Sequence, residues 1–163
     1  MRKKIRLLLD SLVSPYDMAN IFQVALATGS CKLYLSGKSL NHKHPKVESK
    51  LKSWHVKGEA DITYFATFDK AANKLHKEGY NLIGTSPSAK KSFYELDLSK
   101  NNEIMVFGPE SGGLSKEKKK YLDDLVKIPM ASDLEFMTLS VAVPIIVYEI
   151  FRQRIIEDEA LER

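Results

Sequence analysis

The nine residues Phe107-Gly-Pro-Glu-Ser-Gly-Gly-Leu-Ser115 form the most informative stretch of the sequence. They follow the apolar run Glu103–Phe107, which predicts a buried strand, and they precede a helix expected to begin near Ser115. A loop at the carboxyl end of a parallel strand is where α/β proteins bind ligands, and glycines let the backbone approach a ligand closely. The stretch lacks Gly-Lys-Ser/Thr and therefore is not a P-loop, and no GxGxxG follows any expected strand. A tight turn without function is the alternative interpretation.

Strand-like and helix-like segments alternate on both sides of this loop. Further strands are expected at Ile5–Leu12, Lys32–Ser36, Ile62–Ala66, Asn81–Thr85 and Leu125–Pro129. Helices are expected from Pro15, capped by Ser14, toward Gly29, at Val47–Ser53, at Lys70–Glu78 with Asp69 as the cap, and at Met137–Arg154. Repeated units of this kind predict an α/β fold with a mostly parallel sheet covered by helices on both faces.

Length and composition favour one globular unit. The 163 residues predict a single domain at 1–156 followed by a charged tail at 157–163. The 44% hydrophobic and 28% charged fractions exclude a disordered or fibrous chain. The N-terminal leucines stop at Asp10, too early for a signal peptide, and no apolar run is long enough to span a membrane. The single cysteine, Cys31, suits a reducing compartment, so a cytoplasmic protein is expected.

A basic segment suggests a polyanionic partner. Between Lys38 and Lys57 the sequence has six lysines and three histidines against one acid. Such a cluster indicates either a solvated face or a phosphate-binding patch. The candidate RNA-binding residues are Lys43, Lys46, Lys50 and Lys52. Trp54 either stacks on a base or anchors the segment to the core. The histidines have no accompanying cysteine pair, so no metal site is expected.

Three segments taken together point to a known family. The first is the helix Ser14–Gly29, the second is Ile104–Ser115, and the third combines Ile128-Pro-Met130 with Leu139–Ala142 and Val147–Gln153. They resemble the SpoU/TrmH branch of the SPOUT superfamily of RNA methyltransferases. The resemblance spans about residues 5 to 155, and the short chain looks most like the minimal TrmL-like members.

The resemblance implies a fold, a cofactor and an assembly. The C-terminal segment would form a deep trefoil knot, and S-adenosyl-L-methionine (SAM) would bind in the knotted pocket. The implied function is a SAM-dependent RNA methyltransferase acting on tRNA or rRNA, with the ribose 2′-hydroxyl as the default acceptor. Family members pair through the C-terminal and first-motif helices. The C-terminal helix here is apolar nearly all round, so a homodimer is expected.

The resemblance also assigns the cofactor-binding residues. They are Gly84, Thr85, Gly108, Glu110, Gly112, Gly113, Ile128, Met130, Phe136 and Met137. Ile128 and Met130 would supply apolar walls for the adenine ring, which needs few polar partners.

The catalytic positions of the family are largely substituted in this chain. Glu110 of the second motif is retained, whereas Asp17 and Gln23 stand where the first motif normally has Asn and Arg. Phe136-Met137-Thr138 stands where the third motif normally has Ser-Leu-Asn. The candidate catalytic residues are therefore Glu110, Gln23, Asp17 and Thr138. Because glutamine cannot take up a proton, two alternatives remain: methylation of a different acceptor atom, or a non-catalytic RNA-binding protein with the same fold.

Overall fold

The structure, a computed structural model, describes residues 3–162, without the side chains of residues 156, 157 and 159–161. Its strands are β1 (Ile5–Asp10), β2 (Cys31–Ser36), β3 (Asp61–Phe65), β4 (Asn81–Thr85), β5 (Lys91–Ser92), β6 (Glu103–Phe107) and β7 (Asp124–Lys127). Its α-helices are α1 (Pro15–Thr28), α2 (Pro45–Ser53), α3 (Phe68–Lys77), α4 (Lys116–Lys119) and α5 (Leu139–Leu161). A 3-10 turn, Phe93–Glu95, follows β5.

The seven strands form one sheet in the order β3-β2-β1-β6-β4-β7-β5, and all the pairings between them are parallel. The chain starts near the middle of the sheet, moves out to β3, and then crosses back to build the other half. Because the strands are parallel, the carboxyl ends of β1, β6, β4 and β7 meet along the same edge. This agrees with the mostly parallel α/β sheet predicted from the sequence.

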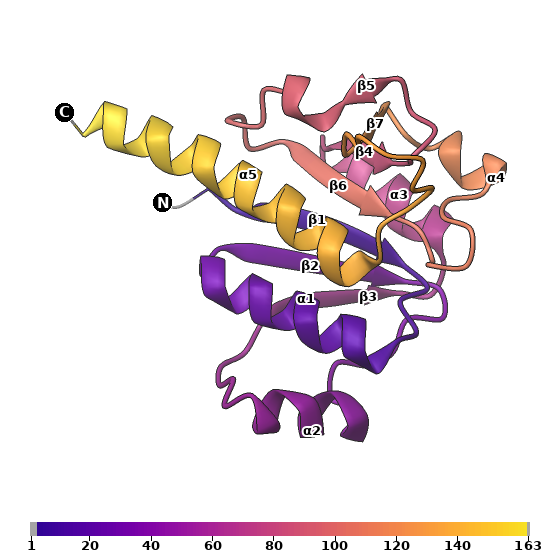
Figure 1. The fold of residues 1–163 in the computed structure, drawn as a ribbon, viewed down its shortest axis with the longest axis vertical. Coiled ribbons are helices and arrows are strands. Elements are labelled where there is room, and N and C mark those ends of the chain that lie inside the picture. Colours follow the sequence, from indigo (N-terminus) through magenta and orange to yellow (C-terminus); the bar gives the residue numbers. More distant parts are fainter. Residues whose placement is uncertain (1–2, 163) are drawn as a thin grey trace.

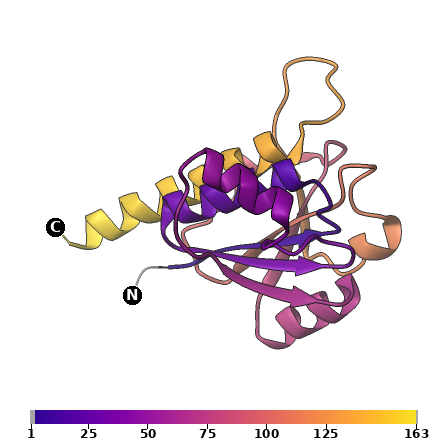
Figure 2. The same ribbon diagram turned by 90° about the horizontal axis from the view of Figure 1, so that it is seen from below.

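Helices cover both faces of the sheet. Figures 1 and 2 show α1 and α5 side by side on one face, with α2 packed outside α1, and α3 on the opposite face. Alternate residues of the buried strands enter the two cores: Leu7 and Leu9 pack with α1 and α5, whereas Leu8 packs with α3. The near-continuous apolar strands in the sequence reflect burial on both faces.

Local signals explain most helix boundaries. The Ser14 hydroxyl accepts a hydrogen bond from the backbone N–H of Asp17 (3.3 Å), and Gly29 ends α1 at a φ of 64°. The prediction that Asp69 caps α3 is wrong. The hydroxyl of Thr67 accepts the Lys70 N–H, and the helix begins at Phe68, whose side chain is buried.

Two further differences concern length. Helix α5 continues to Leu161, past the expected end at Arg154. The predicted helix near Ser115 is the single turn of α4, with Ser115 as its cap. The two-residue strand β5 and the turn after it were not predicted, because segments this short carry no periodic signal.

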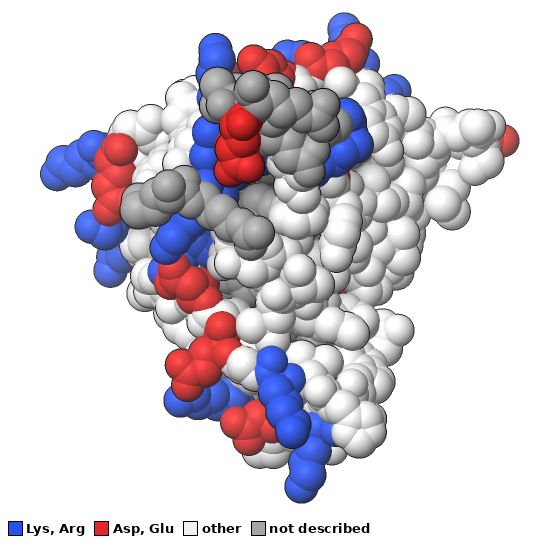
Figure 3. All heavy atoms as spheres, turned by 90° about the vertical axis from the view of Figure 1, so that its left-hand side faces the viewer, with Lys and Arg blue, Asp and Glu red and all other residues white. Residues whose placement is uncertain are grey.

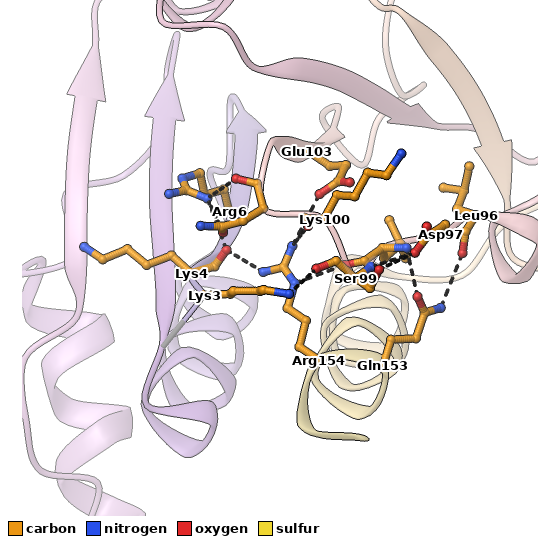
Figure 4. A network of polar contacts seen from close by, with 12 residues as sticks. Lys3, Lys4, Arg6, Leu96, Asp97, Ser99, Lys100, Glu103, Gln153 and Arg154 are labelled. Carbon is orange, nitrogen blue, oxygen red and sulfur yellow. Dashed lines mark hydrogen bonds and ion pairs between the residues drawn. The ribbon is translucent and has the colours of Figure 1, made fainter. Parts of the chain in front are cut away.

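A buried arginine fixes α5 to the amino edge of the sheet (Figure 4). Arg154, only 5% exposed, donates hydrogen bonds to the carbonyl oxygens of Leu98 and Lys100 (both 3.0 Å) and to that of Lys4. It also forms an ion pair with Glu103 (3.4 Å). Burial raises the pKa of Glu103, and the charge of Arg154 opposes that rise. The network joins the last helix to the starts of β1 and β6.

None of the helices described here is long and apolar enough to cross a bilayer.

Candidate functional site

A cavity of about 420 Å³ opens at the carboxyl edge of the sheet. This volume lies within the usual range for small-molecule and cofactor sites. Four segments supply its walls: the ends of β4 and β6 with their following loops, the chain after β7, and the start of α5. The lining residues are Thr85, Ser86, Pro87, Phe107, Gly108, Pro109, Glu110, Gly112, Gly113, Leu114, Lys119, Ile128, Met130, Glu135, Phe136, Met137, Leu139 and Ala142.

The glycine loop after β6 is folded back on itself. The N–H of Gly113 donates to the carbonyl oxygen of Pro109 at 2.8 Å, and Gly112 and Gly113 have φ angles of 131° and 66°. A Cβ on Gly108 would lie 2.4 Å from the backbone nitrogen of Leu114, so glycine is required for the loop to close. The compact loop places the exposed Glu110 side chain at the wall of the cavity.

An ion pair to a buried carboxylate holds the far end of this loop. Asp10, at the end of β1, is 1% exposed and accepts a hydrogen bond from the Ser36 hydroxyl (2.9 Å). Lys118 of α4 pairs with the other carboxylate oxygen. Asp10 is not among the residues predicted from the sequence. The sequence did contain a signal for it: Asp10 is a charged residue at the end of an apolar strand, and strand ends of this kind form the ligand-binding edge of a parallel sheet.

The other walls bring together most of the predicted cofactor residues. Ile128 and Met130 line the cavity from the chain after β7, and Phe136 and Met137 line it from the segment that projects between β7 and α5 in Figure 2. Thr85 also lines it, and its hydroxyl donates to the Val106 carbonyl oxygen (3.2 Å).

Gly84 lies one residue before the cavity and is buried inside β4. A Cβ there would approach Leu122 Cδ1 to 2.3 Å, so this glycine makes room for the packing of the chain beyond α4. Its place in the structure is that of a packing residue, and it is not among the residues that line the cavity.

Two carboxyl groups face each other beside the cavity. Asp17 is 3% exposed, and its side chain faces Glu110 and, on α5, Ser140. The Asp17 atom Oδ2 is buried without a hydrogen-bond partner among the described residues. Burial first, and then the neighbouring Glu110, raise the pKa of Asp17 to about 7, while the N–H and hydroxyl of Ser140 oppose the rise. Ser140 is a further residue that the sequence did not indicate.

The two remaining candidate catalytic residues are Gln23 and Thr138. Gln23 is exposed on α1. Thr138 is the residue just before α5, and its hydroxyl lies 3.1 Å from that of Ser140. Neither is among the residues that line the cavity in the described part of the chain. Of the predicted catalytic set, the structure brings Asp17 and Glu110 together, with Thr138 next to them through its contact with Ser140, whereas Gln23 is exposed outside the cavity lining.

The basic segment forms an outer surface of the molecule. Lys43, Lys46 and Lys52 are exposed on α2 and the preceding loop, and Figure 3 shows Lys and Arg side chains interspersed with Asp and Glu at this lower end. The Lys50 ammonium lies 5.4 Å from the centre of the Tyr16 ring, on α1. Trp54 packs edge-on against the same ring with 37% of its surface exposed, so it anchors the segment to α1.

No group of three metal-ligating side chains occurs among the side chains described for residues 3–162.

Comparison with known proteins identifies relatives over nearly the whole chain. The profile of the SpoU rRNA Methylase family matches residues 4–148. The 23S rRNA (guanosine-2′-O-)-methyltransferase RlmB of Xanthomonas campestris pv. campestris is 29% identical over 152 residues, which cover 91% of this chain and 59% of that protein. The chain thus spans a little over half the length of the curated relatives it matches first.

Solved structures share the fold. A protein from a study of the 2-OH methylation of C/U34 on tRNA is 27% identical, with a TM-score of 0.78 and coverage of 93% of this chain and 96% of that one. The SpoU methyltransferase AviRb of Streptomyces viridochromogenes, solved with AdoMet, is 23% identical, with a TM-score of 0.80 and coverage of 95% and 59%.

Proposed function

The chain belongs to the SpoU rRNA methylase family, and on that basis we propose that it is an enzyme that transfers a methyl group from SAM to RNA. The observation that carries the proposal is the cavity at the carboxyl edge of the sheet, which gathers nine of the ten cofactor residues assigned from the sequence: Thr85, Gly108, Glu110, Gly112, Gly113, Ile128, Met130, Phe136 and Met137. The relatives named as rRNA and tRNA methyltransferases support the same reaction class.

The cavity fits a nucleoside cofactor by shape and chemistry. The loop closes only because residue 108 is a glycine, and Gly112 and Gly113 carry no side chains that would occupy the cavity, so a ligand could approach the loop backbone closely. Ile128, Met130 and Leu139 supply apolar walls suited to an adenine ring. SAM, when bound, would supply an electrophilic methyl group. The residues around it would orient the acceptor and exclude water.

We infer that the acceptor is a ribose 2′-hydroxyl of rRNA or tRNA, as the names of the relatives suggest. Glu110 is the retained carboxylate at the cavity wall, and a carboxylate there would accept a hydrogen bond from an acceptor hydroxyl. Gln23 lies outside the cavity and carries no charge, so the chain supplies no guanidinium from this position. A slow transfer by the purified protein alone is therefore expected.

Three further features belong to the same proposal. We propose that the chain is knotted where the segment after β7 passes the glycine loop, since both segments line one cavity. A homodimer would form through α1 and α5, which lie side by side and expose Val141 and Tyr148. An enzyme that acts on rRNA or tRNA would work in the cytoplasm.

Calorimetry with S-adenosylhomocysteine tests the cofactor step directly. Binding with micromolar affinity and thermal stabilisation is expected. The absence of both at millimolar ligand would exclude the proposal.

Nucleoside analysis of RNA from a strain lacking the protein then tests the acceptor. Loss of one 2′-O-methylated nucleoside supports the ribose acceptor. Loss of a base-methylated nucleoside would reassign the acceptor atom, and an unchanged profile despite cofactor binding would favour a non-catalytic RNA-binding role.

A further inference from the structure

A buried carboxyl group with an unsatisfied oxygen lies next to the proposed active site. Asp17 is on the first turn of α1, and its Oδ2 has no hydrogen-bond partner among the described residues. The titratable group that faces it is Glu110, from the loop after β6. From α5, Ser140 offers its N–H and hydroxyl.

Two ionised carboxylates in this arrangement would be unfavourable. A buried anion needs several donors, and the N–H and hydroxyl of Ser140 serve only part of the Asp17 carboxylate. The Glu110 charge adds repulsion at short range. A single proton between the two groups removes both costs, because it neutralises Asp17 and provides a donor for Glu110.

We propose that Asp17 and Glu110 share one proton at neutral pH, with protonated Asp17 donating a hydrogen bond to the Glu110 carboxylate and fixing it at the cavity wall. Asp17 is then a positioning residue that acts through Glu110. The shared proton is independent of the function proposed above, whereas its effect on ligand binding rests on that function.

The arrangement makes the cavity sensitive to pH. Loss of the proton from Asp17 removes the donor and sets two negative charges against each other. Because Glu110 is exposed on a loop and Asp17 is buried between α1 and α5, Glu110 is the group that moves. A ligand that depends on the Glu110 position should bind more weakly as pH rises through neutrality.

Stability measurements test the shared proton without any ligand. The pKa of Asp17 is about 7 in the folded protein, whereas that of an unfolded aspartate is 3.8. Between these pH values only the folded protein keeps the proton, so the contribution of Asp17 to stability falls as pH rises. The Asp17→Asn variant keeps the shape and a donor but cannot ionise. Its melting temperature relative to the wild type should therefore rise from pH 5 to pH 7, reach a gain of several degrees, and stay constant above about pH 8.

Two variants sharpen this test. Glu110→Gln removes the neighbouring charge. The pH at which half of the Asp17-dependent stability is lost should therefore be lower in this variant than in the wild type. Glu135→Gln removes another glutamate of the cavity wall, and its difference from the wild type should not vary with pH. Parallel curves for Asp17→Asn and the wild type, or an Asp17→Asn protein that fails to fold, would overturn the proposal, because an amide supplies the same donor.

Binding of S-adenosylhomocysteine at pH 6 and pH 8.5 tests the consequence for the cavity. The dissociation constant of the wild type should rise at least fivefold between these values, and that of Asp17→Asn less than twofold. An equal rise in both proteins would overturn the positioning role. If no variant binds the ligand at either pH, the proposed function fails, while the stability curves still decide whether the proton is shared.

Discussion

At the scale of single residues, the cavity depends on the absence of a side chain at Gly108 as much as on the groups that line it. The loop closes through one backbone hydrogen bond, from Gly113 to Pro109, and it brings the backbone around Leu114 to the place where a Cβ of residue 108 would lie. The position of Glu110 follows from this closure. A small change at Gly108 should therefore affect the site more than a larger change on the surface.

Gly108→Ala should weaken binding of S-adenosylhomocysteine about tenfold or more, because the added methyl group, 2.4 Å from the Leu114 nitrogen, must displace the loop. Calorimetry measures the effect. Gly79→Ala is the matched control: it adds the same methyl group outside the cavity lining, where no atom lies within 4 Å, at the cost of a strained φ of 90°. Equal affinities for the two variants would show that loop closure at Gly108 is not needed for binding.

At the scale of elements, two helices carry distinct roles. Helix α5 contributes to the cavity at its start, through Leu139 and Ala142, and is fixed by Arg154 near its other end. Helix α2 contributes nothing to the sheet and presents lysines to solvent. Substitutions at the end of α5 should therefore affect stability, and substitutions on α2 should affect RNA binding.

Arg154→Met should lower the free energy of unfolding by about 3–5 kcal/mol, because it leaves Glu103 buried without its partner and three backbone carbonyl groups without a donor. Denaturant unfolding gives the value. Arg152→Met, two residues earlier, removes an exposed arginine that pairs with Glu149, and it should have little effect. A loss as small as that of the control would mean that the network contributes nothing to stability.

Changing Lys43, Lys46, Lys50 and Lys52 to glutamine should weaken RNA binding and reduce the slope of log affinity against log salt by roughly 0.7–0.9 for each phosphate that the protein no longer neutralises. Filter binding over a salt series measures both quantities. The control carries the same change at Lys70, Lys74, Lys77 and Lys120, which are exposed on or next to α3 and α4. If both variants keep the wild-type slope, the lysines of α2 face solvent and do not contact the phosphates of the RNA.

At the scale of the whole molecule, the charged side chains are unevenly distributed. In Figure 3 the α2 end carries clusters of charge, whereas the part of the surface toward the right is largely uncharged. Val13, Tyr16, Val141 and Tyr148 are all close to half exposed or more, and they flank or belong to α1 and α5. A surface of this kind is typical of an interface between copies of one chain.

Sedimentation should therefore give twice the 18.5 kDa chain mass, and the pair Val141→Glu with Tyr148→Glu should give monomers. The buried charge would not be tolerated at a dimer interface. Tyr94→Glu, at another exposed tyrosine in the turn after β5, should leave the dimer intact. A monomeric wild-type protein at micromolar concentration would contradict the assembly.

The sequence predicted the architecture better than the chemistry. The apolar strands and the Ser14 and Gly29 boundaries of α1 follow from local patterns, and the residues around Phe107–Ser115 indicated the cavity. The Asp17–Glu110 contact joins positions 93 residues apart and forms only when α1, α5 and the loop are assembled. For the same reason, neither the Arg154 network nor the ion pair of Asp10 and Lys118 could be recognised from spacing.

The contact between Arg154 and the carbonyl of Lys4 also has a consequence for synthesis on the ribosome. It joins residues 150 positions apart, and β1 pairs on one side with the neighbouring β2 but on the other with β6, about a hundred residues later in the chain. Contacts over such separations form slowly and carry a large loop-closure entropy. The emerging polypeptide would therefore hold an unpaired edge of β1 until β6 has left the exit tunnel, and the last steps of folding would wait for residue 154. That interval is when the nascent chain is most open to aggregation and to chaperone binding.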